Sequence, residues 1–277
     1  MIPCLNNATT GAASFEGFLQ AATAAGFPAI EVGQLEEYVR AHSLEALKEE
    51  LRSRGLKLGS GGAPVNWQGT EEQFTADLDA LPRRLELCQQ VGLERLCTWV
   101  PPRWNVPYVE AFAFCRDRLG AVADALGKGG IRFGLEFVGP QGNFLDRPYK
   151  FISTLAEMMH FIEKMGRDNL GLLLDSYHLY VAEAPLTELA ALPESRIVQF
   201  HINDAYPGIP RPQLEDLKRL LPGQGAIPLV PMLRALAATG YDWTLSIETF
   251  SDEVKAQGPA KAAKMAKDAV DSILAVL

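Results

Sequence analysis

Short apolar runs alternate along this chain with longer stretches in which apolar residues recur at helical spacing. The short runs are typical of strands. Those that are apolar throughout fit a parallel sheet covered on both faces. We therefore expect eight strands, over residues 2–5, 29–32, 57–60, 95–100, 132–138, 170–175, 197–204 and 243–250.

The longer stretches begin at residues that cap helices, and several end at glycine. Thr70-Glu-Glu-Gln, for example, has the spacing of a capping box, and Gly92 ends the periodic stretch that follows. Such signals predict helices over 14–26, 43–55, 70–92, 108–126, 154–165, 186–192, 229–238 and 260–277. A further helical turn is expected around 214–220, in a segment rich in proline.

The strand and helix patterns alternate from end to end without a linker or a break in composition. Eight such units predict a single (β/α)8 TIM barrel that forms one domain over residues 1–277. An open doubly wound sheet is the alternative. That fold commonly carries a glycine-rich phosphate turn after the first strand, and the segment Leu5-Asn-Asn-Ala-Thr-Thr-Gly11 lacks the pattern.

Four runs in the second half carry a carboxylate or a histidine near their end, namely Glu136, Asp175, His201 and Glu248. Taken singly, each has an ordinary explanation as a rim ion pair, a helix cap or a packed core residue. In a barrel, however, the carboxyl ends of strands five to eight lie side by side, at the face that carries the chemistry. Three carboxylates that converge there repel one another unless protons or a cation neutralise them.

This set of donors predicts one divalent metal ion. Three oxygen donors and an imidazole suit Mn²⁺, Mg²⁺, Co²⁺ or Fe²⁺, and Zn²⁺ is an alternative. We expect Mn²⁺ or Mg²⁺.

Composition and charge narrow the class of protein. Hydrophobic residues make up 48% of the 277 residues and charged residues 22%, as in globular proteins. A net charge of −8 argues against nucleic-acid or membrane partners. Four scattered cysteines form no CxxC pair, which favours a reducing cytoplasm. Neither a signal peptide nor a membrane-spanning run is expected.

The motifs also resemble a known family. G-L-E-F, L-L-L-D-S-Y-H, V-Q-F-H-I-N-D, P-G-Q-G and S-I-E-T follow the order seen in the xylose isomerase-like barrel superfamily. More narrowly, the chain is similar to the sugar (phosphate) isomerases and epimerases, the group that contains ketose 3-epimerases and inosose dehydratase. The resemblance implies that Glu136, Asp175, His201 and Glu248 hold the metal, that Glu136 and Glu248 are also the acid/base pair, and that His178 contacts substrate oxygens. It also implies a homodimer or homotetramer.

Weaker candidates lie in the loops. Trp67 and Trp99, after strands three and four, are candidates for an aromatic wall against the substrate, and packing is an equal alternative. Arg211 and Arg219, near the P-G-Q-G turn, are candidates for a substrate contact or for solvated surface charges. We expect Asp204 to orient His201 or to bind substrate.

Glu31, at the end of strand two, is expected to support the site from behind or to form a rim ion pair.

These observations predict a metal-dependent isomerase or epimerase of a small sugar or polyol. It would move a proton α to a carbonyl through a metal-stabilised enediolate, with Glu136 and Glu248 as acid and base. A dehydratase acting on an inosose or a dehydroshikimate-like ring is the alternative on the same scaffold.

Two other readings carry less weight. An apurinic-site endonuclease needs more histidines than the four present, and a non-catalytic sugar-binding protein predicts a damaged ligand set.

Overall fold

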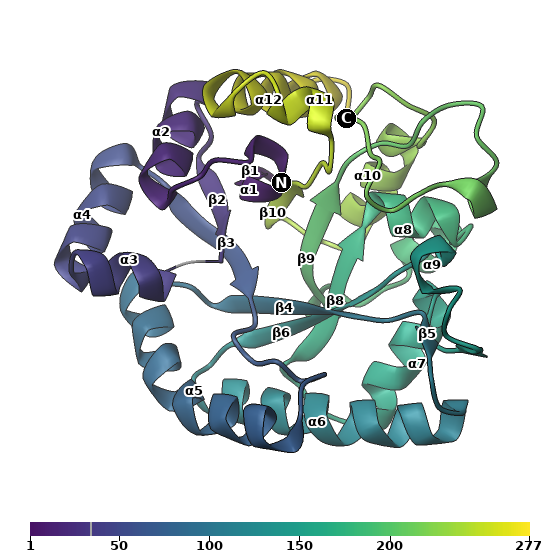
Figure 1. Cartoon of the computed structure of the whole chain (residues 1–277). Coiled ribbons are helices and arrows are strands. Elements are labelled where there is room, and N and C mark those ends of the chain that lie inside the picture. Colours follow the sequence, from purple (N-terminus) through teal and green to yellow (C-terminus); the bar gives the residue numbers. More distant parts are fainter. Residues whose placement is uncertain (34) are drawn as a thin grey trace.

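The chain forms a closed barrel of parallel strands surrounded by helices (Figure 1). The structure is a computed structural model that describes residues 1–33 and 35–277. Within those residues eight strands close the barrel, and in sequence order they are β1 (Ile2–Asn6), β2 (Ala29–Val32), β3 (Lys57–Gly62), β4 (Arg95–Val100), β6 (Arg132–Phe137), β8 (Leu170–Asp175), β9 (Ile197–Ile202) and β10 (Thr244–Ile247). The predicted (β/α)8 barrel is confirmed.

The barrel closes where the first strand pairs with the last. β1 lies between β2 and β10 in the sheet, so residues from the two ends of the chain share one side of the barrel. β6, β8, β9 and β10 are consecutive neighbours, as the sequence predicts for strands five to eight. Their carboxyl ends therefore meet at one sector of the barrel mouth.

The outer layer consists of the main helices that connect the strands. They are α2 (Phe15–Ala25), α4 (Leu44–Arg54), α5 (Glu71–Val91), α6 (Tyr108–Lys128), α7 (Leu155–Met165), α9 (Leu186–Ala190), α10 (Leu229–Ala238) and α12 (Pro259–Leu274). The sequence predicts each of them within a few residues. The capping box at Thr70 is present: its side chain accepts from Gln73, whose side chain accepts from the Thr70 backbone N–H.

Short elements at the loops go beyond the prediction. They comprise the helices α1 (Asn7–Thr10), α3 (Leu35–Ala41), α8 (Ser176–Val181) and α11 (Asp252–Lys255), the 3-10 turns at Gly142–Phe144, Glu194–Arg196 and Arg211–Gln213, and the pair β5 (Arg103–Trp104) and β7 (Tyr149–Lys150). Such elements span about two turns or fewer, too few residues for apolar periodicity to be visible.

The helical turn predicted around residues 214–220 is reduced to one hydrogen-bonded turn, in which the Lys218 N–H donates to the Glu215 carbonyl at 3.0 Å, and the 3-10 turn of this segment precedes it at Arg211–Gln213. The Asp204 N–H donates to the Leu220 carbonyl and the Leu220 N–H donates back, so the chain pairs there as an isolated antiparallel bridge. The Tyr177 hydroxyl donates to the Glu215 carbonyl at 2.8 Å and to that of Lys218 at 3.4 Å. These contacts hold the segment in an irregular course across the barrel mouth.

No helix in residues 1–33 and 35–277 is long and apolar enough to cross a membrane.

Candidate metal centre

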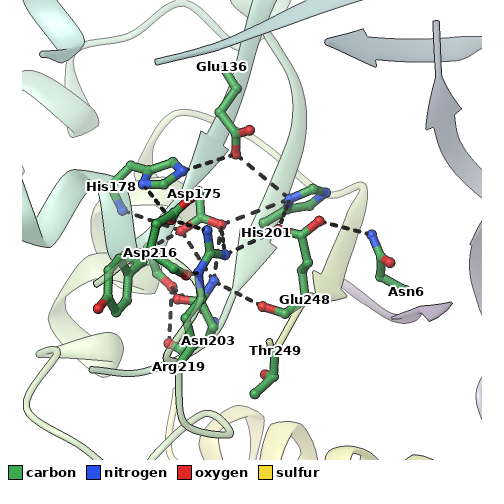
Figure 2. Close-up of polar contacts among 12 residues, drawn as sticks. Asn6, Glu136, Asp175, His178, His201, Asn203, Asp216, Arg219, Glu248 and Thr249 are labelled. Carbon is green, nitrogen blue, oxygen red and sulfur yellow. Dashed lines mark hydrogen bonds and ion pairs between the residues drawn. The ribbon is translucent and has the colours of Figure 1, made fainter. Parts of the chain in front are cut away.

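Four predicted side chains meet at the carboxyl ends of consecutive strands (Figure 2). Glu136 lies on β6, Asp175 ends β8, His201 lies on β9, and Glu248 directly follows β10. The His201 Nδ1 atom is 3.4 Å from a Glu248 oxygen and 3.9 Å from oxygens of both Glu136 and Asp175. Strand pairing causes this convergence, because Asp175 pairs directly with His201 across β8 and β9.

Three side-chain atoms of the cluster have no hydrogen-bond partner in the described part of the chain, namely His178 Nδ1 and two atoms at its centre. The two central atoms are Glu136 Oε1 and His201 Nδ1, both buried. A buried polar atom without a partner costs about 1–3 kcal/mol, so such atoms are rare unless something else binds them. Their position between further carboxylates is what a divalent cation requires. The donor set therefore fits a metal ion.

The donors fall into two overlapping groups. Asp175, His201 and Glu248 form one group, and Glu136, Asp175 and His178 form the other, with the donor atoms of each within 4.8 Å of one another. The His178 Nε2 atom is 3.8 Å from Glu136 Oε1. The predicted substrate contact His178 thus lies beside the predicted ligand set, close enough to be a further donor.

The pKa values of Glu136 and Glu248 are shifted in opposite directions. Burial, together with the nearby Asp175 and Glu248 carboxylates, raises the pKa of Glu136 well above its usual value. Burial opposes ionisation of Glu248 as well, but the charges of His201 and Arg219 outweigh it and lower the pKa of that carboxyl. The two glutamates predicted to share acid/base work therefore differ in proton affinity, as such pairs do in enzymes.

Glu31, on β2, orients His201 from across the barrel. The His201 Nε2–H donates to Glu31 at 2.9 and 3.1 Å, and the Ser246 hydroxyl donates to the same carboxylate at 2.5 Å. Burial lowers the pKa of His201, but the charges of Glu31 and Glu248 raise it well above its usual value. Because Nε2 is committed to Glu31, Nδ1 faces the cluster.

Arg219 lies inside the cluster, as one of the two predicted arginines. Its Nη1 donates to Asp175 at 2.9 Å and to Glu248 at 3.1 Å, and its Nη2 donates to Asp216 at 2.7 Å. The side chain is buried, and the pKa of Arg219 is raised by these carboxylates despite its burial. The guanidinium thus offsets part of the crowded negative charge.

Arg211 lies apart from the site. It pairs with Glu183 at 3.2 Å, stacks over the ring of Tyr180, and lines neither cavity described below. This placement favours the alternative of a solvated surface charge.

The two tryptophans predicted near the substrate lie in different environments. Trp67 is buried, its indole N–H donates to Thr98, and its ring packs near Trp104 and Phe114. This placement favours the alternative of packing for Trp67. Trp99 is 42% exposed at the end of β4, with Phe144 beside it, and it lines the cavity next to Glu136.

Asp204 binds the P-G-Q-G turn, which corrects the expectation that it orients His201. Its carboxylate accepts backbone N–H groups from Ala205, Gly223, Gly225 and Ile227 at 2.8–3.0 Å. A side chain at residue 225 would collide with the Ala205 carbonyl, so this close approach requires glycine.

Sequence reasoning missed Asn203 and Asp216. The Asn203 amide donates to both Asp175 oxygens at 3.2 and 3.0 Å, and to the Glu248 carbonyl at 3.2 Å. Its position two residues after His201 was a usable signal, since alternate residues of a strand share a face. Asp216 contacts Arg219 and lies 3.7 Å from His178, but it belongs to an irregular segment with no period to reveal it.

Two cavities open at the cluster, and both are lined by Glu248. One, of about 300 Å³, continues past Glu136 and His178 to Trp99 and Phe250. The other, of about 340 Å³, is lined by Asn6 and Glu31. A closed parallel barrel with clustered carboxylates, a histidine and adjoining cavities at its carboxyl face has the architecture of a metal-binding barrel enzyme.

Comparison with known proteins gives the family. The model of the xylose isomerase-like TIM barrel family matches residues 19–275, so the chain belongs to that family. Inosose isomerase of Bacillus velezensis is 26% identical over 98% of this chain and 96% of its own length. Ketose 3-epimerase of Arthrobacter globiformis is 23% identical over 92% of this chain and 85% of its own. 3-Dehydroshikimate dehydratase of Pseudomonas putida is 24% identical over 92% of this chain but only 39% of its own length. These relatives are enzymes, which confirms the prediction that this chain is an enzyme.

Solved structures of similar proteins share this fold. A xylose isomerase domain protein from Alicyclobacillus acidocaldarius superposes with a TM-score of 0.92 at 32% identity, covering 100% of this chain and 99% of its own. The IOLI protein with a bound zinc atom superposes with a TM-score of 0.85 at 26% identity, again covering 100% and 99%.

Proposed function

We propose that this chain is a divalent-metal-dependent isomerase or epimerase of a small sugar or polyol ketone. One observation carries the proposal: Glu136 Oε1 and His201 Nδ1 are buried without partners among converging carboxylates, at the face where barrels carry their chemistry. The names of the relatives, inosose isomerase and ketose 3-epimerase, support the same class of reaction.

In this proposal Glu136, Asp175, His201 and Glu248 hold the ion, with His178 beside them. Mn²⁺ or Mg²⁺ suits the three oxygen donors, and zinc in the IOLI protein supports a divalent ion in general. When bound, the cation would polarise the substrate carbonyl and stabilise negative charge on its oxygen.

The protein's own residues would move the proton. Glu136 and Glu248 reach the cluster from different strands, so one would remove the proton α to the carbonyl and the other would return it. Arg219 would keep Glu248 ionised, and His178 would donate to substrate oxygens beside Glu136. Trp99 would form a wall of the cavity and exclude water there.

A dehydratase is the second candidate, because 3-dehydroshikimate dehydratase is a relative over 92% of this chain. The same base would remove the α-proton, and a β-hydroxyl would leave in place of reprotonation. The product would be conjugated or enolic and would absorb in the ultraviolet, which an epimerised product would not.

The test combines metal content with proton exchange. The wild-type protein is expected to bind close to one divalent ion and to exchange the α-proton of a ketose or inosose with deuterium oxide, followed by NMR. Glu248→Gln is expected to weaken metal binding and abolish exchange, and Glu253→Gln, which changes an exposed glutamate on α11, is the matched control. A wild-type protein that binds none of Mn²⁺, Mg²⁺, Co²⁺ and Zn²⁺ would refute the proposal.

A further inference from the structure

The cavities at the cluster are lined by negative charge. Glu31, Glu136, Asp216 and Glu248 line them, and the Asp175 carboxylate contacts Arg219, which lines one of them. Among the described lining residues Arg219 is the one side chain with a permanent positive charge. Even after a divalent cation is added, the formal charge of these groups stays negative.

Arg219 has little capacity left for an anionic ligand. Its Nε donates to the Asp216 carbonyl, and its two terminal nitrogens donate to the carboxylates of Asp175, Glu248 and Asp216. The nearby cations Arg147 and Lys255 lie over the rings of Phe144 and Phe250, and they line neither cavity. A phosphate or carboxylate on the substrate would therefore find no unpaired cation among the described lining residues.

The backbone position where barrels often bind phosphate is already filled. In (β/α)8 barrels that position lies in the loops after strands seven and eight. Here the seventh barrel strand is β9, and the Asp204 carboxylate accepts the N–H groups of Gly223, Gly225 and Ile227 in the loop after it. This protein thus supplies its own anion where a phosphate would otherwise bind.

After the eighth barrel strand, β10, two backbone donors are paired as well. The Thr249 N–H donates to the Thr9 hydroxyl at 2.9 Å, and the Val254 N–H donates to the Ser251 hydroxyl at 3.3 Å. Neither of these N–H groups is available to a phosphate without loss of its present partner.

The cavity beside Glu136 also has apolar lining residues. Trp99, Phe144 and Phe250 line the cavity beside Glu136, and Leu217 contributes a side chain at its rim. Aromatic faces suit the C–H surface of a sugar or cyclitol, whereas an ionised group against them would lose hydration without compensation.

We infer that the site selects an uncharged polyhydroxy ketone and discriminates against phosphate esters and carboxylates. This inference rests on the proposed function, whose substrate it specifies. Among the substrates that the relatives' names give, the inference favours neutral ketoses and inososes over 3-dehydroshikimate, whose ring carries a carboxylate.

Ligand binding to the Mn²⁺-loaded protein tests the inference without turnover. D-Fructose and D-fructose 6-phosphate form one pair of probes, and a neutral inosose and 3-dehydroshikimate form another. Calorimetry, checked by paramagnetic relaxation of ligand nuclei, should show the neutral member binding at least about 10-fold tighter at low salt, with a smaller ratio at high salt. Equal or tighter binding of the charged member overturns the inference, and so does failure of every probe to bind.

A pair of leucine variants tests the cause. Leu217→Lys places a cation at the cavity rim, and it should raise the affinity for the phosphate ester relative to fructose by about 5-fold or more. Leu145→Lys adds the same charge at a residue that is 70% exposed and lines neither cavity, and it should leave the ratio unchanged. Equal effects of the two variants, or none from Leu217→Lys, would contradict the charge argument.

Proton exchange separates this inference from the proposed function. A protein that prefers neutral ligands but exchanges no α-proton refutes the isomerase proposal and supports the selectivity. A protein that exchanges the phosphate ester faster than the neutral ketose supports the isomerase proposal and overturns the selectivity.

Discussion

Glu31→Gln would remove the charge that holds His201 in place. The Nε2–H of His201 lies 2.9 and 3.1 Å from the two carboxylate oxygens, and both side chains are at most 10% exposed. A buried hydrogen bond to a charged partner contributes about 1.5–3 kcal/mol. If that energy fixes Nδ1 toward the ion, the variant should bind Mn²⁺ about 10–100-fold more weakly.

Calorimetry with Mn²⁺ near pH 8 is the assay, because proton competition at His201 is weaker there than at neutral pH. Ser246→Ala is the matched control: it removes a hydrogen bond to Glu31 but keeps the carboxylate, so affinity should fall less than about 3-fold. Thermal unfolding of both variants monitors the fold. Unchanged affinity in a folded Glu31→Gln protein would show that Glu31 does not position this ligand.

Three further predictions concern protons, loop stability and thiols. The pKa values of Glu136 and His201 are raised in the free protein and a bound cation would lower them, so Mn²⁺ affinity should increase with pH and binding should release protons, measured by calorimetry in buffers of different ionisation enthalpy. Asp204→Ala leaves four N–H groups unpaired, those of Ala205 and Ile227 buried and those of Gly223 and Gly225 partly buried, and should lower the free energy of unfolding by about 3 kcal/mol or more in urea titrations, whereas a loss below about 1 kcal/mol would contradict the assigned role. Burial raises the pKa of Cys88 to about 11 and those of the other three cysteines further, so all four thiols should react with DTNB only slowly at pH 8 until the protein unfolds; rapid labelling of the native protein would contradict this.

The repeating architecture was predictable because it depends on patterns that span many residues. Helices such as α5 carry a cap, an apolar stripe and a terminal glycine, and these signals agree with one another. The irregular segment before the P-G-Q-G turn was not predictable. Its course depends on contacts with residues distant in sequence, such as the Tyr177 hydroxyl on Glu215, which leave no local pattern.

The candidate site was most predictable at the strand ends, whereas the loops offered Arg219 only as one of two alternative arginines. Strand ends locate Asp175 and His201, because the fold brings all the strand ends to one face. Residues that reach the cluster from loops, such as Asp216 and Arg219, depend on side-chain direction. For the same reason Trp67 and Trp99, at similar places in the sequence, occupy different environments.

Asp175 performs two tasks with one carboxylate, and this restricts which residues can replace it. One oxygen caps α8, accepting the N–H of Tyr177 at 2.6 Å, while the other faces Arg219 and the cluster. Asparagine, serine and threonine cap helices but bring no negative charge, and glutamate brings the charge but caps poorly. Among homologues that keep both the ion and α8, we expect aspartate alone at this position. A natural sequence with another residue here should have lost the metal, the helix or both.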